Sequence, residues 1–359
     1  MRPDRPISVL VVDDSAANRR AITRILENAP GIKVVDRAAD GEEGLKKAVA
    51  LQPDVITLDL EMPRLDGYTF LRLLMAKAPT PVIVISSYGH PSDVFKALQL
   101  GAFDFVAKPS RGDKESLEGV RAELVEKVRA ARFMRRDEKP TASPPRHRAP
   151  KDKPRAPKPE RALVLAVGAS TGGPPAVQRL LEGLAGLPVC VLVAQHMPPR
   201  FTDAFAQRLD QTVPFRVKEA KSGDPVATGR VYIAPGGEQL ELMEKDGQLV
   251  LHVCPTTPAD KHAPSVDRLF TSVAKLCGPE AKGAVLTGMG SDGAAGSRAL
   301  AEAGGEVWAE AEESAVVFGM PQAAIATGKV KFVLPLDQLA RGLARSLKAA
   351  ADAARSTYF

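Results

Sequence analysis

The chain contains few cysteines for its length. Among 359 residues there are three, Cys190, Cys254 and Cys277, and no two of them have the CxxC spacing. Disulfide frameworks and structural zinc sites need more cysteines, or closer ones. Cys190 lies within an apolar run, so we interpret it as a small buried hydrophobic residue. The cysteine content therefore predicts neither a disulfide framework nor a metal site, and it fits a reducing, cytoplasmic location.

Long apolar runs and nucleic-acid motifs are also missing. No apolar run approaches the roughly 20 residues that a membrane span needs, and residues 1–5 lack the apolar stretch of a signal peptide. The formal net charge is +6, but the chain carries no helix-turn-helix, zinc-finger or RNA-binding signature. We therefore expect no membrane insertion and no nucleic-acid partner.

The positive charge is concentrated in one segment. Residues 135–161 contain ten Lys or Arg, four Asp or Glu and seven prolines, so the rest of the chain is neutral overall. This composition is typical of an extended, solvated linker, and weak binding of an acidic partner is the alternative. A chain of this length favours two domains. We predict one domain at residues 1–134, a linker at 135–160 and a second domain at 161–359.

Apolar runs and helical periodicity alternate in the first domain. The predicted strands are residues 8–12, 32–36, 55–58, 82–85 and 103–106, and the predicted helices are residues 16–28, 41–50, 68–76, 93–100 and 114–134. Five strand–helix units predict an α/β domain with a doubly wound, flavodoxin-like parallel sheet.

Polar side chains follow the strands of this predicted sheet. Asp13 and Asp14 follow the first strand, Asp59 the third, Ser86 the fourth and Lys108 the fifth. Carboxyl ends of parallel strands share one edge, and three carboxylates there repel one another unless a hard cation such as Mg²⁺ neutralises them. An aspartate beside Mg²⁺ and a lysine ammonium can accept a phosphoryl group. Each acid alone would more often be a helix N-cap or a solvated loop residue.

With this set of residues, positions 7–130 resemble a response-regulator receiver domain. The resemblance implies that Asp59 is the phospho-acceptor and that Mg²⁺ is a cofactor, held by the carboxylates of Asp13, Asp14 and Asp59 and by the backbone carbonyl of Glu61. It also implies that Ser86 and Lys108 contact the phosphoryl group and that Phe105 is an aromatic switch residue. The peptide between Lys108 and Pro109 is expected to be cis.

The second domain has its own series of strands. They are predicted at residues 163–167, 189–194, 216–218, 231–234, 284–287, 306–309 and 331–334, with helices at 174–184, 201–209, 266–276 and 294–303. Residues 239–243 and 248–253 flank Asp246-Gly247, which is a hairpin signal. We predict a second α/β sheet, mostly parallel, with one antiparallel hairpin.

Three short motifs place nucleophile-type residues at the ends of these strands. Gly168-Ala-Ser-Thr-Gly-Gly173 carries Ser170, Gln195-His-Met-Pro198 carries His196, and Thr287-Gly-Met-Gly-Ser-Asp-Gly293 carries Asp292. Because strand ends of a parallel sheet meet at one edge, the three side chains can converge. Ser, His and Asp in contact are a known solution to acyl transfer.

Each motif has another interpretation. The glycine-rich loop could bind phosphate at a helix N-terminus, although it is not GxGxxG; it is not the GxSxG of α/β-hydrolases either, and the order Ser, His, Asp differs from theirs. His196 alone could be a structural histidine, and Asp292 alone a helix N-cap.

Together, these motifs resemble the catalytic domain of chemotaxis protein-glutamate methylesterases. Further stretches that resemble the family are Gln195-His-Met-Pro-Pro-Arg-Phe-Thr202, Tyr232-Ile-Ala-Pro-Gly236, Pro264-Ser-Val-Asp267 and Val316-Val-Phe-Gly-Met-Pro321, and a receiver joined to the N-terminal side is the family's arrangement. The chain departs from the family at Ala263, where a basic residue is frequent, so receptor recognition could differ.

The resemblance implies a serine esterase that removes γ-methyl esters from receptor glutamates and also deamidates receptor glutamines. Ser170, His196 and Asp292 would be catalytic, with Thr171 and Met289 at the oxyanion site or supporting it, and no cofactor would be needed there. Expected partners are methyl-accepting chemotaxis receptors and a chemotaxis histidine kinase, the phosphodonor. Three alternatives stay open: a receiver-controlled binding module without catalysis, an output domain that binds a nucleotide, and the same esterase in a pathway other than flagellar chemotaxis.

Overall fold

The chain divides into two compact units, Met1–Pro145 and Arg146–Phe359, and each is described by itself. The structure is a computed structural model that describes residues 5–86, 91–108, 114–131 and 162–356. The linker predicted at 135–160 and the domain limits predicted at 134 and 161 fall at or within a segment outside the described residues, so these limits stay predictions.

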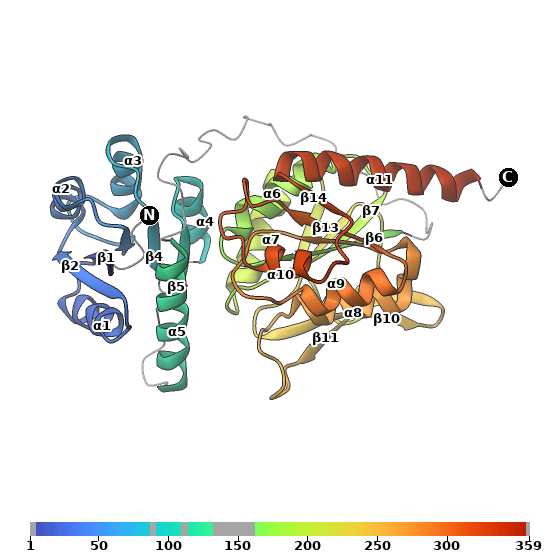
Figure 1. The fold of residues 1–359 in the computed structure, drawn as a ribbon, viewed down its shortest axis with the longest axis horizontal. Helices are drawn as coiled ribbons and strands as arrows, with labels where there is room; N and C mark the ends of the chain where they lie inside the picture. Colours follow the sequence, from blue (N-terminus) through green and yellow to red (C-terminus); the bar gives the residue numbers. More distant parts are fainter. Residues whose placement is uncertain (1–4, 87–90, 109–113, 132–161, 357–359) are drawn as a thin grey trace. The chain divides into compact units, whose positions relative to one another are not determined.

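The N-terminal unit is a five-stranded parallel sheet in the order β2-β1-β3-β4-β5. Its strands are β1 (Ile7–Val12), β2 (Ile32–Ala38), β3 (Val55–Leu58), β4 (Val82–Ser86) and β5 (Asp104–Ala107). Its helices are α1 (Ala16–Glu27), α2 (Gly41–Leu51), α3 (Gly67–Lys77), α4 (Pro91–Gln99) and α5 (Lys114–Ala131). Because α1 contacts α5 and α2 contacts α3, helices cover both faces of the sheet, as Figure 1 shows. The doubly wound prediction is confirmed.

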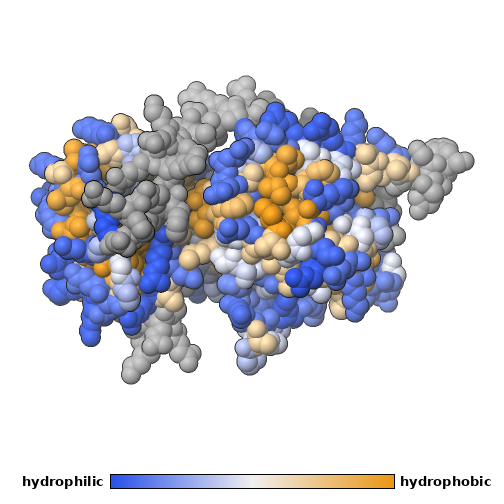
Figure 2. Space-filling view, viewed as in Figure 1, coloured by the Kyte–Doolittle hydropathy of each residue, from blue (hydrophilic) through white to orange (hydrophobic). Residues whose placement is uncertain are grey.

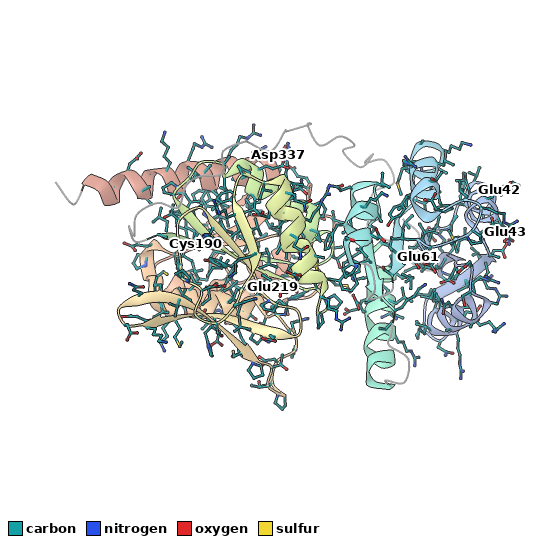
Figure 3. All side chains as sticks on the ribbon, turned by 180° about the vertical axis from the view of Figure 1, so that it is seen from behind. Glu42, Glu43, Glu61, Cys190, Glu219 and Asp337 are labelled. Carbon is teal, nitrogen blue, oxygen red and sulfur yellow. The ribbon has the colours of Figure 1, made fainter. Side chains whose placement is uncertain are left out.

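The C-terminal unit has a seven-stranded parallel sheet in the order β14-β13-β12-β6-β7-β9-β8. Its strands are β6 (Leu163–Ala169), β7 (Val189–Gln195), β8 (Arg216–Glu219), β9 (Arg230–Ile233), β12 (Lys282–Val285), β13 (Glu306–Glu310) and β14 (Phe332–Leu334). The central strands β6 and β7 are continuous apolar runs because both of their faces are covered. Cys190 lies on β7 with no exposed surface, as predicted (Figure 3).

Helices cover both faces of this second sheet. They are α6 (Gly173–Gly183), α7 (Phe201–Thr212), α8 (Val266–Cys277), the 3-10 turn η1 (Gly278–Glu280), α9 (Ala294–Glu302), α10 (Met320–Ala326) and α11 (Leu336–Ser356). On one face α6 contacts α11 (Figure 1). An ion pair of 2.8 Å joins Arg179 to Asp337, which Figure 3 labels at the start of α11. On the other face α8 contacts α9. Figure 2 shows apolar patches within a largely hydrophilic surface, and the edge strand β14 exposes Phe332 and Val333.

Helices α10 and α11 were not among the predicted helices, and the hairpin and the end of β12 also differ from the sequence prediction. The hairpin of β10 (Glu238–Lys245) and β11 (Gln248–Pro255) forms a separate two-stranded sheet, because β10 buries Leu240 and Leu242 against α8 instead of extending the main sheet. Its turn is the predicted Asp246-Gly247, with both residues at positive φ. Strand β12 ends at Val285, two residues earlier than predicted, so Thr287 lies beyond the strand. No helix among the described residues is long and apolar enough to cross a bilayer.

Candidate functional site

The register of β6 and β7 brings Ser170 and His196 to adjacent positions. The last paired residues of the two parallel strands are Ala169 on β6 and Gln195 on β7. Ser170 immediately follows β6, and His196 immediately follows β7. The His196 N–H donates to the Ala169 carbonyl at 3.0 Å, and the Ser170 N–H donates to the carbonyl of Thr287, just beyond β12, also at 3.0 Å. The three sequence motifs therefore meet at one edge of the sheet.

Asp292 lies at the centre of a dense set of hydrogen bonds. Its carboxylate contacts Nε2 of His196 at 2.8 Å and accepts hydrogen bonds from the Ser265 hydroxyl at 3.1 Å and from the N–H groups of Val266 and Asp267 at 2.7 and 2.9 Å. Burial alone would raise the pKa of Asp292, but His196 and these backbone donors hold that pKa well below its usual range. Asp292 is thus an ionised acceptor of fixed direction. It favours the tautomer with the proton on Nε2 and leaves Nδ1 of His196 for another partner.

The turn at Gly288 lies beside Ser170. The Gly288 carbonyl accepts the N–H groups of Gly319 and Met320, at 3.1 and 2.8 Å. Because the peptide is planar and trans, the Met289 N–H points away from that carbonyl. A Cβ at Gly288 would lie 2.9 Å from Cβ of Ser170 and 2.4 Å from Sδ of Met320, so this close approach requires glycine.

Thr171 is hydrogen-bonded to Thr287, which begins the turn that contains Gly288. It is buried, and its carbonyl accepts the Thr287 hydroxyl at 2.9 Å. Across the described ranges, the N–H groups of Thr171 and Met289 have no hydrogen-bond acceptor, and the Ser170 hydroxyl makes no hydrogen bond either. A nucleophile next to two unpaired backbone donors is the arrangement that acyl transfer uses.

Two residues near this site were missed by sequence reasoning. His262 stacks on His196, with ring centroids 4.4 Å apart and planes 9° apart. Partial burial and the charge of His196 lower the pKa of His262, and Asp292 opposes this. In the sequence, the only indication of a role for His262 was its position next to Ala263 and three residues before Ser265.

Glu310, at the end of β13, is the second missed residue. It is 1% exposed; its carboxylate accepts the Thr287 N–H at 2.8 Å and the Ser314 hydroxyl at 2.9 Å. Burial without a cationic partner raises the pKa of Glu310, only partly offset by these two hydrogen bonds. It therefore supports the turn that carries Met289. A strand-end carboxylate was a signal that the sequence contained.

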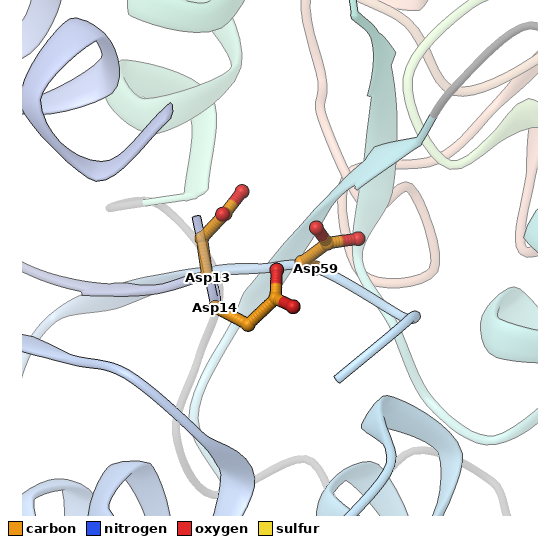
Figure 4. Close-up of side chains that lie close together, drawn as sticks. All are labelled: Asp13, Asp14 and Asp59. Carbon is orange, nitrogen blue, oxygen red and sulfur yellow. The ribbon is translucent and has the colours of Figure 1, made fainter. Parts of the chain in front are cut away.

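The N-terminal unit has a second polar site. Carboxylate oxygens of Asp13, Asp14 and Asp59 lie within 4.8 Å of one another (Figure 4). Nζ of Lys108 lies 2.6 Å from Asp59 and 3.5 Å from Asp13. Burial raises the pKa of Asp13, Lys108 opposes this and Asp59 adds to it. An oxygen-rich cluster of this size suits a small hard cation, and the lysine neutralises it from one side only.

The remaining predicted residues lie around this cluster. The Lys108 N–H donates to the Ser86 carbonyl at 2.6 Å, and the Glu61 N–H donates to the Asp59 carboxylate at 3.3 Å. Phe105 on β5 is buried, with the Lys127 ammonium 5.1 Å from its ring centroid. A Cβ at Gly67 would lie 2.7 Å from the Asp59 carbonyl oxygen, so the start of α3 packs against the turn that follows Asp59. The predicted cis peptide involves Pro109, outside the described residues.

The fold and the two sites define a receiver domain joined to an α/β unit with a Ser–His–Asp arrangement. A family profile described as "Response regulator receiver domain" matches residues 9–118, and one described as "CheB methylesterase" matches residues 165–343. The chain belongs to the family of protein-glutamate methylesterases/protein-glutamine glutaminases, so the family resemblance is confirmed.

Relatives match along nearly the whole chain. "Protein-glutamate methylesterase/protein-glutamine glutaminase 1" of Myxococcus xanthus is 62% identical, over 94% of this chain and 96% of that protein. "Protein-glutamate methylesterase/protein-glutamine glutaminase 6" of Anaeromyxobacter dehalogenans is 52% identical, over 97% of this chain and 97% of that protein. The crystal structure of the Thermotoga maritima CheB methylesterase catalytic domain is 36% identical, with a TM-score of 0.50, and covers 52% of this chain and 99% of that one.

Glu310→Gln provides a stability test of the buried carboxylate. The pKa of Glu310 is higher in the folded state than in the unfolded state. Its contribution to the free energy of unfolding is therefore fully present below the unfolded-state pKa and is lost as the pH rises through the folded-state pKa. The glutamine oxygen accepts the Thr287 N–H, and its amide N–H donates to the Ser314 hydroxyl oxygen, so both contacts are kept without charge. We expect the variant to melt at a higher temperature than wild type at pH 8, with the difference shrinking towards pH 5. A variant that melts lower at pH 8 would contradict this account.

Proposed function

We propose that this chain is a phosphorylation-regulated protein-glutamate methylesterase in which Ser170 is the nucleophile, His196 the general base and Asp292 the group that orients His196. The observation that carries the proposal is the joint placement of Ser170 beside His196 and of His196 on Asp292, at one sheet edge, in a chain of this family. The substrate is the γ-methyl ester of a glutamate on a chemotaxis receptor.

The reaction follows from this geometry. The Ser170 hydroxyl attacks the ester carbonyl, and Nδ1 of His196 takes its proton because Nε2 is held by Asp292. The tetrahedral oxyanion is stabilised by the N–H groups of Thr171 and Met289. When it collapses, His196 returns the proton to the leaving methoxide and methanol departs. Water that His196 deprotonates then cleaves the acyl-enzyme, yielding glutamate and restoring Ser170.

The same site would deamidate glutamine. Attack on the γ-amide gives the same acyl-enzyme, with ammonia leaving in place of methanol after protonation by His196. No cofactor is needed for either reaction. The phosphate-loop alternative is disfavoured because the Gly168–Gly173 turn is occupied by contacts with Thr287 and Gln195.

For the N-terminal unit we propose phosphoryl transfer to Asp59 from a chemotaxis histidine kinase. Asp13, Asp14 and Asp59, with the Glu61 carbonyl, fit Mg²⁺, because the donors are oxygens and the carboxylates already cluster. Bound there, Mg²⁺ would supply charge neutralisation. The Lys108 ammonium would neutralise the phosphoryl oxygens from the other side, and Ser86 and Phe105 would report the modification. We propose further that phosphorylation relieves a restraint that the receiver unit exerts on esterase activity, and that the protein acts in the cytoplasm, where the kinase is expected.

Ser170→Ala tests the nucleophile. We expect methanol release from methylated receptor fragments to fall by about 10⁴-fold or more, because the remaining groups cannot form the acyl-enzyme. The melting temperature should be unchanged. Ser297→Ala is the matched control, since Ser297 is buried on α9 and its hydroxyl has no partner among the described residues. Wild-type turnover in Ser170→Ala would refute the triad.

Asp59→Asn tests the switch. Basal methanol release should be unchanged, while the increase produced by a small phosphodonor with Mg²⁺ should disappear, because an amide cannot accept the phosphoryl group. Asp36→Asn, a change of an acid on β2 outside the cluster, should keep the increase. Activation of the Asp59→Asn variant would place the phosphorylation site elsewhere. Equal activity of the full chain and a fragment starting near residue 160, without phosphodonor, would rule out the proposed restraint.

A further inference from the structure

Gln195 joins the nucleophile turn to the base through one amide group. It is the last residue of β7 and only 1% exposed. Its Nε2 donates to the Ser170 carbonyl at 2.8 Å and to the His196 carbonyl at 3.1 Å. Both residues that would exchange the proton in catalysis are therefore fixed by the same side chain.

The orientation of this amide is determined by its surroundings. Two carbonyl oxygens face one end of the side chain, so that end must be the donor, and a flipped amide would place three acceptors together. The other end, Oε1, is buried and has no hydrogen-bond partner among the described residues. An unsatisfied buried acceptor is costly, and the two hydrogen bonds donated by Nε2 offset that cost.

The glycine-rich turn is shaped around Gln195. A Cβ at Gly173 would lie 2.0 Å from Oε1 of Gln195 and 2.9 Å from Cβ of Ala169. No real side chain could occupy that position without displacing the amide. The amide of Gln195, the first residue of the Gln195–Pro198 motif, thus requires glycine at position 173, the last residue of the Gly168–Gly173 motif.

The consequence concerns the Thr171 N–H. The Ser170 carbonyl accepts both the Gly173 N–H, at 2.8 Å, and the Gln195 amide, also at 2.8 Å. In a planar trans peptide the following N–H points opposite to the carbonyl. Holding the Ser170 carbonyl with two donors therefore fixes the direction of the Thr171 N–H, which has no acceptor in the described part of the chain.

We propose that Gln195 is a positioning residue that aims the Thr171 N–H at the developing oxyanion and holds His196 in register with Ser170. The inference rests on the proposed function, since it assigns a support to the same site. Gln195 itself is buried behind the turn and does not touch the substrate.

The test compares Gln195→Met, which keeps the length but removes the donor, with Gln195→Glu, which keeps the shape but presents a carboxylate to the two carbonyls. Gln178→Met on α6 is the control, because the side chain of Gln178 hydrogen-bonds to Glu182 on the same helix, with no other partner among the described residues. Two rates are measured on the full chain: methanol release from methylated receptor fragments, and covalent labelling of Ser170 by a fluorophosphonate. Labelling needs no receptor and also places an oxygen at the oxyanion site. Melting temperature reports folding.

In both Gln195 variants we expect kcat and the labelling rate to fall together, by about 10- to 100-fold. This decrease does not exceed the one expected when an oxyanion donor is removed outright. KM should stay within about twofold, and Gln178→Met should match wild type. The proposal is overturned if a folded Gln195 variant labels at the wild-type rate, or if KM changes while kcat does not. If wild type labels readily but releases no methanol, the proposed function fails, and the labelling rates still decide the role of Gln195.

Discussion

The ionised carboxylate of Asp292 organises the sheet edge at which Ser170 and His196 meet. It receives hydrogen bonds from the end of β7 through His196 and from the start of α8 through Ser265, Val266 and Asp267. The Asp267 carboxylate in turn accepts the N–H groups of Gly293 and Gly296 at the start of α9. Two helices on one face of the sheet are thereby connected to His196 at the end of the central strand β7. A buried charge of this kind persists only because so many donors surround it.

A second constraint keeps the nucleophile turn rigid. The carbonyls of Ser170 and Gly288 are each held by two donors. Such double anchoring is what preorganisation means at an oxyanion site: the donors do not have to rotate when charge develops. Glu310 also stabilises the turn that begins at Thr287, because its carboxylate accepts the Thr287 N–H. The site is therefore built from backbone groups whose directions are set by buried side chains.

Much of this arrangement could be predicted from the sequence. Strand ends in a parallel sheet share an edge, so apolar runs followed by Ser170, His196 and Asp292 indicated a common site, and the same rule placed Asp13, Asp59 and Lys108 together. The supports were harder to see. Gln195 and Glu310 act through buried hydrogen bonds whose partners lie 25 and 23 residues away in the chain, and the stacking of His262 on His196 depends on a loop conformation that periodicity does not determine. The separate hairpin was missed because the turn signal gives the pairing of β10 with β11 but not the surface on which the pair packs.

The most direct test of the account is a crystal structure of the full chain after reaction with a phosphonate ester. The account predicts a phosphonyl group on the Ser170 hydroxyl oxygen, with one phosphonyl oxygen about 2.7–3.1 Å from the N–H groups of Thr171 and Met289. His196 should remain on Asp292 through Nε2, with Nδ1 facing the phosphonate. A phosphonyl group on another residue, or a phosphonyl oxygen directed into solvent away from both N–H groups, would contradict the account.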